Sequence, residues 1–374
     1  MGDVMRVDGE SWSRLDVERH NASLESVASV RAVELQEGSQ RGVRVVEFRN
    51  GAGLAFDVLV DRAMDIGSAG FRGRQFAWHS GTGFRHPGLH EYSDEGGISW
   101  LRSFSGLTVT AGLDHTLFTA VSDASHHHYP HRETVWNGLH GRVANIPARL
   151  VGHGVEHQGD NPVLWVEGEI TQAAVFGEYL RLNRRIECDA DGDEIRLIDR
   201  VRNIGFDRQP HMFLYHINFG WPLLAEGTRF VAPILETTWQ SDSVDEQGAS
   251  HLTIPGPQPD FVEQVYEHRL AANKSGETSA MLVNDRLEWA LEVTWRLDQF
   301  PCFFQWMHLR EGAYAIAFEP STNSVMGRLA AEEDGTLAWL QHGEERVYET
   351  RFKIHSSPAA IAEAEERCAQ RGQI

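Results

Sequence analysis

The segment FLYHINFGWPLL, residues 213–224, alternates like a β-strand whose two faces differ. One face is apolar and aromatic and consists of Phe213, Tyr215, Ile217 and Phe219, because successive side chains of an extended strand point to opposite sides. The other face carries Leu214, His216 and Asn218. Gly220 and Pro222 are expected to end the strand. We therefore expect a core strand that presents an imidazole and an amide on its second face; the alternative for His216 is a buried histidine bonded to a neighbour.

A second strand is expected in GAYAIAFEPSTN, residues 312–323. Its bulky side chains, Tyr314, Ile316 and Phe318, share one face, and Ala313, Ala315, Ala317 and Glu319 share the other. Small side chains leading up to a carboxylate leave room above a sheet, so we expect a hollow that takes a ligand beside Glu319. The alternative is an edge-strand glutamate that faces water.

The same kind of pattern continues on both sides of these segments, from about residue 28 to residue 355. Short apolar alternations, as at 43–50, 54–61 and 164–170, are separated by Gly, Pro, Asp and Asn, which is typical of successive antiparallel strands. A hairpin is expected around 189–193, with Asp191-Gly192 as a turn of positive φ. The chain is thus predicted to be all-β.

One helix is expected, in the tail SPAAIAEAEERCAQRG at 356–372, which has Ser-Pro at its start and Gly at its end. The chain contains no repeat of fixed period and no stretch rich enough in Gly, Ser or Pro to be a linker. We therefore expect a single domain over 1–374, with the β-sandwich at about 28–355 and the helix at 356–372.

Composition excludes several classes of partner. The formal net charge of −20 disfavours binding to nucleic acid or to anionic membranes. The three cysteines, Cys188, Cys302 and Cys368, are too few and too far apart for a disulfide framework. The start of the sequence is polar, and no apolar stretch approaches the roughly 18 residues of a membrane span. A cytoplasmic protein without a membrane or nucleic-acid partner is expected.

A third segment, NGLHGRVANIPARL at 137–150, is expected to form a turn followed by a strand-like run. Glycines flank His140, which lets a ligand approach the backbone, and Arg142 offers a fork of donors to ligand oxygens. A histidine in this setting can donate or accept a proton near neutral pH.

Together, the three segments resemble the aldose 1-epimerase, or galactose mutarotase, family. The matching motifs are a histidine-glycine turn (His140-Gly141), a histidine followed by an aromatic and an asparagine (residues 215–219), and a C-terminal glutamate (residues 318–320). Residues 61–78 resemble the opening hairpin of that family. The sequence motifs are most similar to those of an uncharacterised branch of the superfamily, whose members have runs like those at 61–66, 100–104 and 215–223. The resemblance covers roughly residues 40–350.

The resemblance implies a large antiparallel β-sandwich of the galactose-mutarotase type, also called a supersandwich, that acts without a cofactor on a sugar. It implies that Glu319, held ionised, is the base and that His216, held protonated, is the acid. His140 and Arg142 would orient hydroxyl groups, and Asn218 would also bind the substrate. The partner is then a small sugar or sugar derivative, bound by a monomer or homodimer.

The sequence departs from that family at two places. An asparagine-arginine pair before the first histidine is missing, and Arg102 or Arg142 is expected to substitute for it. The aspartate that holds a sugar hydroxyl is also missing, and Gln305 and Trp306 in CFFQWMHLR are the local candidates, one for hydrogen bonding and one for stacking on the sugar.

Two other functions compete with a sugar mutarotase or epimerase. One is an enolising isomerase or lyase of a keto-sugar or uronate, with or without the assistance of a metal bound to His126, His127, His128 and His131. These histidines also fit a solvated surface loop, so we assign no metal ligand. The other is a sugar-binding module without turnover.

The charged residues near the opening hairpin also have two interpretations. Arg62, Arg102 and Arg142 either converge on the carboxylate of an acidic sugar, with Asp65 in the same substrate site, or Asp61, Arg62 and Asp65 form a buried ion pair that braces the hairpin.

Overall fold

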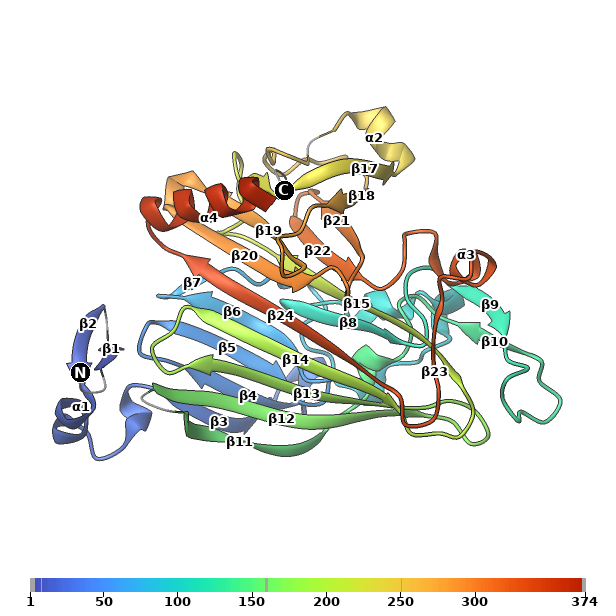
Figure 1. Ribbon diagram of the computed structural model, residues 1–374, viewed down its shortest axis with the longest axis horizontal. Coiled ribbons are helices and arrows are strands. Elements are labelled where there is room, and N and C mark those ends of the chain that lie inside the picture. Colours follow the sequence, from blue (N-terminus) through green and yellow to red (C-terminus); the bar gives the residue numbers. More distant parts are fainter. Residues whose placement is uncertain (1–3, 8, 159–160, 250, 372–374) are drawn as a thin grey trace.

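The computed structural model describes residues 4–7, 9–158, 161–249 and 251–371, and it is built mainly from antiparallel β-sheets (Figure 1). One layer is an eight-stranded sheet. Its strands, in spatial order, are β11 (Arg149–Gln158), β12 (Asn161–Ala173), β13 (Tyr179–Asp189), β14 (Glu194–Asn203), β24 (Glu345–His355), β20 (Trp289–Arg296), β19 (Glu277–Asn284) and β16 (Arg229–Val231).

The facing layer consists of a five-stranded and a seven-stranded sheet. The five strands are β3 (Ser29–Glu34), β4 (Arg44–Arg49), β5 (Leu54–Leu59), β6 (Asp65–Phe71) and β7 (Arg74–Gln75). The seven are β17 (Ile234–Gln240), β18 (Gln264–Leu270), β21 (Cys302–His308), β22 (Ala315–Ser321), β15 (Gln209–Phe219) and β23 (Ala338–Leu340) in that order, with β8 (Thr108–Leu113) also paired to β15. The predicted large antiparallel β-sandwich is confirmed.

Shorter elements lie around the sandwich. Two small hairpins are β1 (Val4–Val7) with β2 (Glu10–Ser13) and β9 (Ala120–Asp123) with β10 (Thr134–Asn137). The α-helices are α1 (Arg14–His20), α2 (Asp242–Gln247), α3 (Gly327–Glu333) and α4 (Pro358–Arg371). The 3-10 turns are η1 (Leu24–Ser26), η2 (Gly38–Gln40), η3 (Pro87–Leu89), η4 (Asp94–Gly97), η5 (Ser99–Ser103), η6 (Val143–Asn145) and η7 (Asp285–Leu287).

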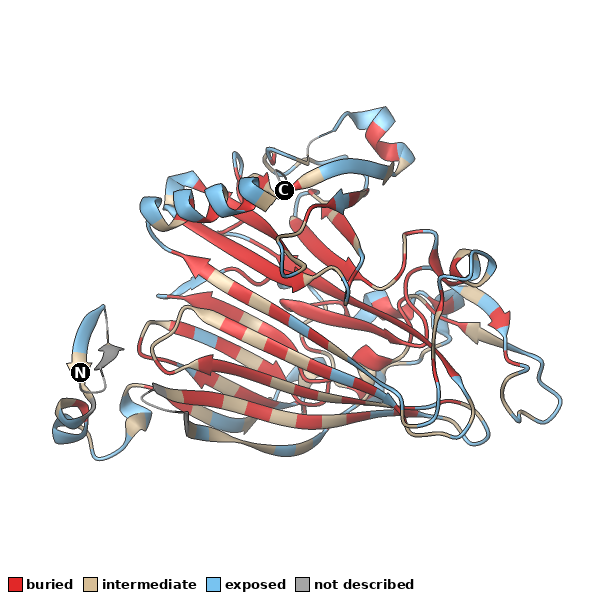
Figure 2. Cartoon of the chain, in the orientation of Figure 1, coloured by how far each residue is buried: buried red, intermediate tan, exposed pale blue. Residues whose placement is uncertain are grey.

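The hydrophobic core lies between the two layers, and burial differs between their strands. On β14 of the eight-stranded sheet buried and partly exposed residues alternate, because one face meets the core and the other meets solvent (Figure 2). By contrast, β8, β15 and β22 are buried along their whole length. The second face of these central strands is therefore covered as well, and that covered face is where the site lies.

Several local predictions need correction. The tail helix is confirmed as α4, whose described part ends at Arg371; Gly372 lies outside the described residues. The short helices α1, α2 and α3 were not predicted. The hairpin between β13 and β14 is present, but Gly192 is not among the glycines of positive φ. Residues 137–150 do not form the expected strand: they form a turn and η6, and β11 begins only at Arg149.

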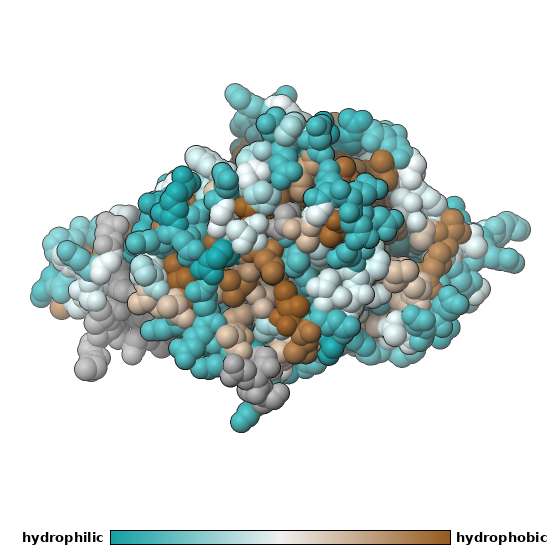
Figure 3. All heavy atoms as spheres, turned by 90° about the horizontal axis from the view of Figure 1, so that it is seen from above, coloured by the Kyte–Doolittle hydropathy of each residue, from teal (hydrophilic) through white to brown (hydrophobic). Residues whose placement is uncertain are grey.

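Seen from above, the protein is largely hydrophilic, with hydrophobic side chains in separate groups (Figure 3). None of the described helices has the length and hydropathy needed to cross a membrane.

Candidate active site

Two neighbouring strands, β15 and β22, bring His216 and Glu319 together. Their antiparallel register pairs Leu214 with Ser321 and Ile217 with Phe318, which places His216 directly opposite Glu319. Cross-strand neighbours in such a pair have their Cβ atoms about 5 Å apart and on the same face. The predicted alternation holds on β15, because the four aromatic and aliphatic side chains at 213, 215, 217 and 219 lie in the main core.

The side chains of His216 and Glu319 are in direct contact and almost fully buried. His216 Nε2 lies 3.3 Å from Glu319 Oε1, and only 3% and 4% of the two side chains are exposed. The expectation that Glu319 faces a hollow is confirmed by the cavity described below, and the alternative of a glutamate in water is wrong.

Asn218 determines which nitrogen of His216 faces Glu319. Its amide nitrogen donates to the carbonyl oxygens of Gly106 and of His216, at 3.0 and 3.1 Å. Its amide oxygen therefore faces His216 Nδ1, 2.5 Å away, and accepts a hydrogen bond from it. The proton on Nδ1 leaves Nε2 as the atom available for acid-base chemistry. Asn218 thus orients the imidazole, where the sequence suggested a substrate-binding residue.

Burial controls the charge of this pair. It lowers the pKa of His216 to about 3, an effect that the bond to Asn218 only partly offsets. It also raises the pKa of Glu319 well above its usual value, and the nearby Glu263 carboxylate raises it further. Burial therefore favours the neutral forms of both groups, a protonated Glu319 beside a neutral His216. The sequence suggested the opposite, an ionised glutamate and a protonated histidine, because the depth of burial was not known.

A cavity of about 270 Å³ opens above the pair. This volume is near the lower end of small-molecule sites, about 300–1,000 Å³, and suits one small ligand. Its titratable lining residues are His140, His216, Glu263 and Glu319, and the rest of its described wall is apolar or aromatic. Those wall residues are Ile98, Trp100, Leu101, Phe104, Leu117, Phe118, Leu139, Trp239, Val265, Phe304, Trp306 and Val325.

The predicted histidine of the turn, His140, lies in this cavity. Its ring centre is 5.8 Å from that of His216 and 4.5 Å from the Trp100 ring. The turn needs its glycine, since Gly141 has φ of +75° and a Cβ there would lie 2.5 Å from the carbonyl oxygens of Gly112 and His115. Burial lowers the pKa of His140 well below its usual value, and His216 and His115 lower it further, so the ring is neutral.

Comparison with known proteins identifies the family of this chain. A family model described as a domain of unknown function, DUF4432, matches residues 40–354. The chain belongs to the DUF4432 family. No curated protein matches it.

Solved structures with the same fold include proteins described as aldose 1-epimerase homologues. A protein from Klebsiella pneumoniae, described as a candidate aldose 1-epimerase, is 21% identical with a TM-score of 0.82; the match covers 92% of this chain and 88% of that one. A galactose mutarotase-like protein from Clostridium acetobutylicum is 11% identical with a TM-score of 0.60, and the match covers 88% and 99% of the two chains. This DUF4432 chain therefore shares its fold with these aldose 1-epimerase-like proteins.

Trp306 and Gln305 of this DUF4432 chain lie on opposite faces of β21. Trp306 lines the cavity, with its ring 5.2 Å from that of His216, in agreement with the expected stacking position. Gln305 is fully buried on the other side, where its amide nitrogen donates to the carbonyl oxygen of His251. The prediction of Gln305 as a sugar ligand is wrong because neighbouring strand residues point in opposite directions.

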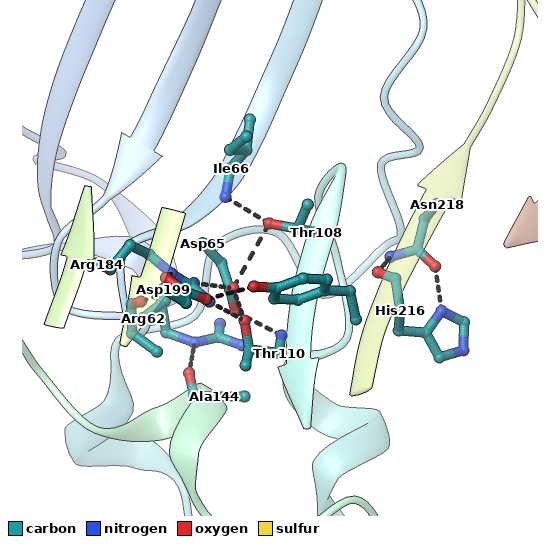
Figure 4. A network of polar contacts seen from close by, with 12 residues as sticks. Arg62, Asp65, Ile66, Thr108, Thr110, Ala144, Arg184, Asp199, His216 and Asn218 are labelled. Atoms are coloured by element: carbon teal, nitrogen blue, oxygen red, sulfur yellow. Dashed lines mark hydrogen bonds and ion pairs between the residues drawn. The ribbon is translucent and has the colours of Figure 1, made fainter. Parts of the chain in front are cut away.

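Arg62 and Asp65 belong to the interior of the protein and not to the cavity. Arg62 is buried and donates to the backbone carbonyls of Ala144, Arg85 and Ser103. Asp65 accepts from Arg184 Nη1 at 2.9 Å, and Arg184 also binds Asp199 at 2.6 Å. Figure 4 shows this network on the side of β15 away from His216. A buried ion pair is therefore present, but the partner of Asp65 is Arg184, not Arg62.

The three arginines do not converge on a carboxylate. Arg102 is exposed and forms an ion pair with Glu95. Arg142 lies over the Tyr92 ring, 3.7 Å from its centre, and lines a different cavity. The expected arginine pocket for an acidic sugar is therefore wrong, and so is the substitution of Arg102 for the missing pair.

The sequence did not assign the aromatic wall or Glu263 to the site. Trp100 and Phe104 stack with ring centres 4.4 Å apart in the segment after η4, and both line the cavity. Both residues belong to the WLRSF run at 100–104, a motif shared with the resembling family, but the resemblance gave Trp100 and Phe104 no role. Nothing in the sequence around Glu263 indicates its place. Among the described residues, no group of three or more histidines, cysteines and carboxylates could hold a metal ion, including the loop at 126–131.

Proposed function

We propose that this protein is a carbohydrate-active isomerase that interconverts the anomers of a sugar by acid-base catalysis. The contact between His216 Nε2 and Glu319 Oε1 at the floor of an aromatic cavity is the observation that carries this proposal. Two proton-transfer groups side by side suit a reaction in which one oxygen loses a proton while a neighbouring oxygen gains one.

The pair performs both halves of the reaction by two proton transfers, one to His216 and one from Glu319. His216 Nε2 accepts the proton of the anomeric hydroxyl while Glu319 donates its proton to the ring oxygen, and the bond between that oxygen and the anomeric carbon breaks. The open aldehyde turns about its neighbouring carbon-carbon bond, and the reverse transfers close the ring on the other face. Each positioned transfer is worth on the order of 10²- to 10⁴-fold in rate.

The walls of the cavity support a sugar ring as the ligand. Trp100, Phe104 and Trp306 surround His216 with ring centres 4.7 to 5.8 Å from the imidazole. Aromatic rings of this kind pack against the C–H face of a sugar and exclude water. Trp100 Nε1 and His140 Nδ1 are buried without hydrogen-bond partners among the described residues, and both residues line the cavity.

The test is anomer exchange measured by NMR across a panel of neutral aldoses, uronates and keto-sugars. We expect faster exchange for at least one sugar and its loss in Glu319→Gln. The matched control is Glu236→Gln, at an exposed glutamate on β17. New alkene signals from a uronate would instead support a lyase. Binding without acceleration of any sugar would support a module without turnover and overturn the proposal.

A further inference from the structure

A second and larger cavity, of about 510 Å³, lies beside the active site. The two cavities share the turn at 139–142: His140 lines the first and Arg142 lines the second. The proposed chemistry does not use the second cavity, which we call the polar cavity because charged and hydrogen-bonding side chains dominate its lining.

Several buried polar groups in the polar cavity lack partners. The His126 side chain is only 5% exposed, yet its Nε2 has no hydrogen-bond partner among the described residues, and its Nδ1 has only the Asp123 carboxylate, 3.7 Å away. His127 Nδ1 and Asn145 Oδ1 also lack a hydrogen-bond partner in the described part of the chain. Buried polar atoms are nearly always paired in folded proteins, so a group of unpaired ones around a cavity indicates that something polar fills it.

Two carboxylates supply acceptors in the same cavity. Asp114 and Glu178 are both buried and line it. Each is held by one neighbour: Gln172 Nε2 donates to Asp114 Oδ1 at 2.6 Å, and the Tyr129 hydroxyl donates to Glu178 Oε2 at 3.0 Å. A carboxylate offers about four lone-pair sites, so both can accept more hydrogen bonds from a ligand.

Arg142 and Tyr92 supply donors. The described part of the chain places no carboxylate or carbonyl oxygen within hydrogen-bonding distance of the Arg142 guanidinium, whose one close partner is the face of the Tyr92 ring. The Tyr92 hydroxyl accepts from the Gly138 backbone nitrogen at 2.6 Å, which leaves its own hydrogen free to donate. His127 adds a neutral imidazole, since burial lowers its pKa to about 4.

We propose that the polar cavity is a second binding site, for a polyhydroxylated small molecule of about monosaccharide size. A hydroxyl group both donates and accepts, so it can bridge a carboxylate and a guanidinium or an imidazole. An inorganic anion would meet Asp114 and Glu178, and an apolar molecule would leave the unpaired groups unsatisfied. The proposal does not depend on the chemistry proposed for His216 and Glu319.

Histidine-labelled protein gives the most direct test. The full chain is labelled with ¹⁵N-histidine, and the imidazole signals of His126 and His127 are assigned through the single variants His126→Gln and His127→Gln. D-galactose, D-glucose, D-galacturonate and inorganic phosphate are then titrated in separate arms. We expect saturable shifts of both histidines with a neutral sugar or the uronate, and the comparison of these two arms shows whether a carboxylate on the ligand adds affinity.

Matched variants locate the binding. Ala173, exposed at the end of β12, lines the polar cavity, so Ala173→Trp should fill it and weaken binding by about tenfold or more. Val151→Trp, at an exposed position on β11 outside the cavity, should leave binding unchanged. Arg142→Leu should also weaken it, while Glu319→Gln should keep it and thereby separate this site from the proposed active site.

Three outcomes overturn the proposal. The first is the absence of saturable shifts with every sugar, which indicates a cavity filled only by water. The second is saturable shifts with phosphate alone. The third is shifts that survive Ala173→Trp but disappear in Glu319→Gln, which would place the binding in the active site.

Discussion

The amide oxygen of Asn218 lies 2.5 Å from His216 Nδ1, on the same face of β15 and two residues along the strand. Because the amide nitrogen of Asn218 is engaged by two carbonyl oxygens, the amide cannot turn to present a donor to the imidazole without losing both bonds. Asn218 is thus a positioning residue that fixes the tautomer of His216 and leaves Nε2 toward Glu319.

Replacing Asn218 with aspartate should change the acid-base behaviour of His216. A carboxylate next to Nδ1 stabilises the imidazolium, so the pKa of His216 should rise from about 3, and the pH profile of anomer exchange should move with it. The pKa is measured by ¹⁵N NMR and the profile by exchange rates. A variant that loses activity with an unchanged His216 pKa would contradict the positioning role.

Glu319→Gln should stabilise the fold while it removes activity. The pKa of Glu319 is raised in the folded state, so the unfolded chain ionises first as pH rises above its ordinary value, and burial of Glu319 then costs stability. Glutamine has the shape of the protonated acid without that cost. We expect a gain in melting temperature that is larger at pH 8 than at pH 5. A loss of stability at pH 8 would contradict the neutral state of Glu319.

The fold should lose stability in acid before its carboxylates titrate. The pKa of His216 is lowered by burial to about 3 and that of His211 to about 4, whereas unfolded histidine titrates near 6.5. The unfolded state therefore binds more protons, and stability falls as pH decreases from about 6.5 towards these folded pKa values. Urea unfolding at pH 7.5, 5.5 and 4.5 measures this, and His216→Gln should flatten the dependence. A pH-independent midpoint would refute it.

Arg184→Met should be strongly destabilising. Arg184 is fully buried and is the shared partner of Asp65 and Asp199, so its loss leaves two buried carboxylates without their cation. Removal of one partner from a buried ion pair typically costs about 3–5 kcal/mol. The exposed pair of Arg31 with Glu47 gives the control, since Arg31→Met should cost less than about 1 kcal/mol. Similar midpoints for the two variants in urea would show that the network contributes little.

Arg102→Leu should leave both the binding of acidic sugars and stability nearly unchanged. Its guanidinium is exposed and paired with Glu95, and solvent screens surface pairs of this kind so that they contribute little to stability. Calorimetric titration with uronates and thermal unfolding measure the two properties. Weaker binding of uronates alone would restore Arg102 to the substrate site.

The strand faces could be predicted from the sequence because His216 and Glu319 each sit in a segment whose two faces differ sharply. Their meeting depends on the register between β15 and β22, which no single segment contains. On β21 both faces are bulky, so alternation alone did not show that Trp306 faces the cavity and Gln305 the interior. The helices α1, α2 and α3 have only 6 or 7 residues, too few to show helical periodicity.

The charged residues were harder to place, because sequence gives a charge but not its partner. Asp65 and Arg184 lie 119 positions apart in the chain and still form one of the central contacts of the interior. The resemblance to a known family supplied the roles expected of His140, His216 and Glu319, whereas the aromatic wall, which comes from connecting segments, had no pattern by which it could be assigned.

The division of the site between strands and connections has a consequence for how it evolves. His216 and Glu319 are held by the register of two central strands, where the insertion of one residue would turn one of these side chains into the core. Trp100, Phe118 and Leu139 come from connections, which tolerate replacement and changes of length. Descendants of one ancestral scaffold can therefore inherit the same proton chemistry and diverge in the molecules they accept, one loop residue at a time.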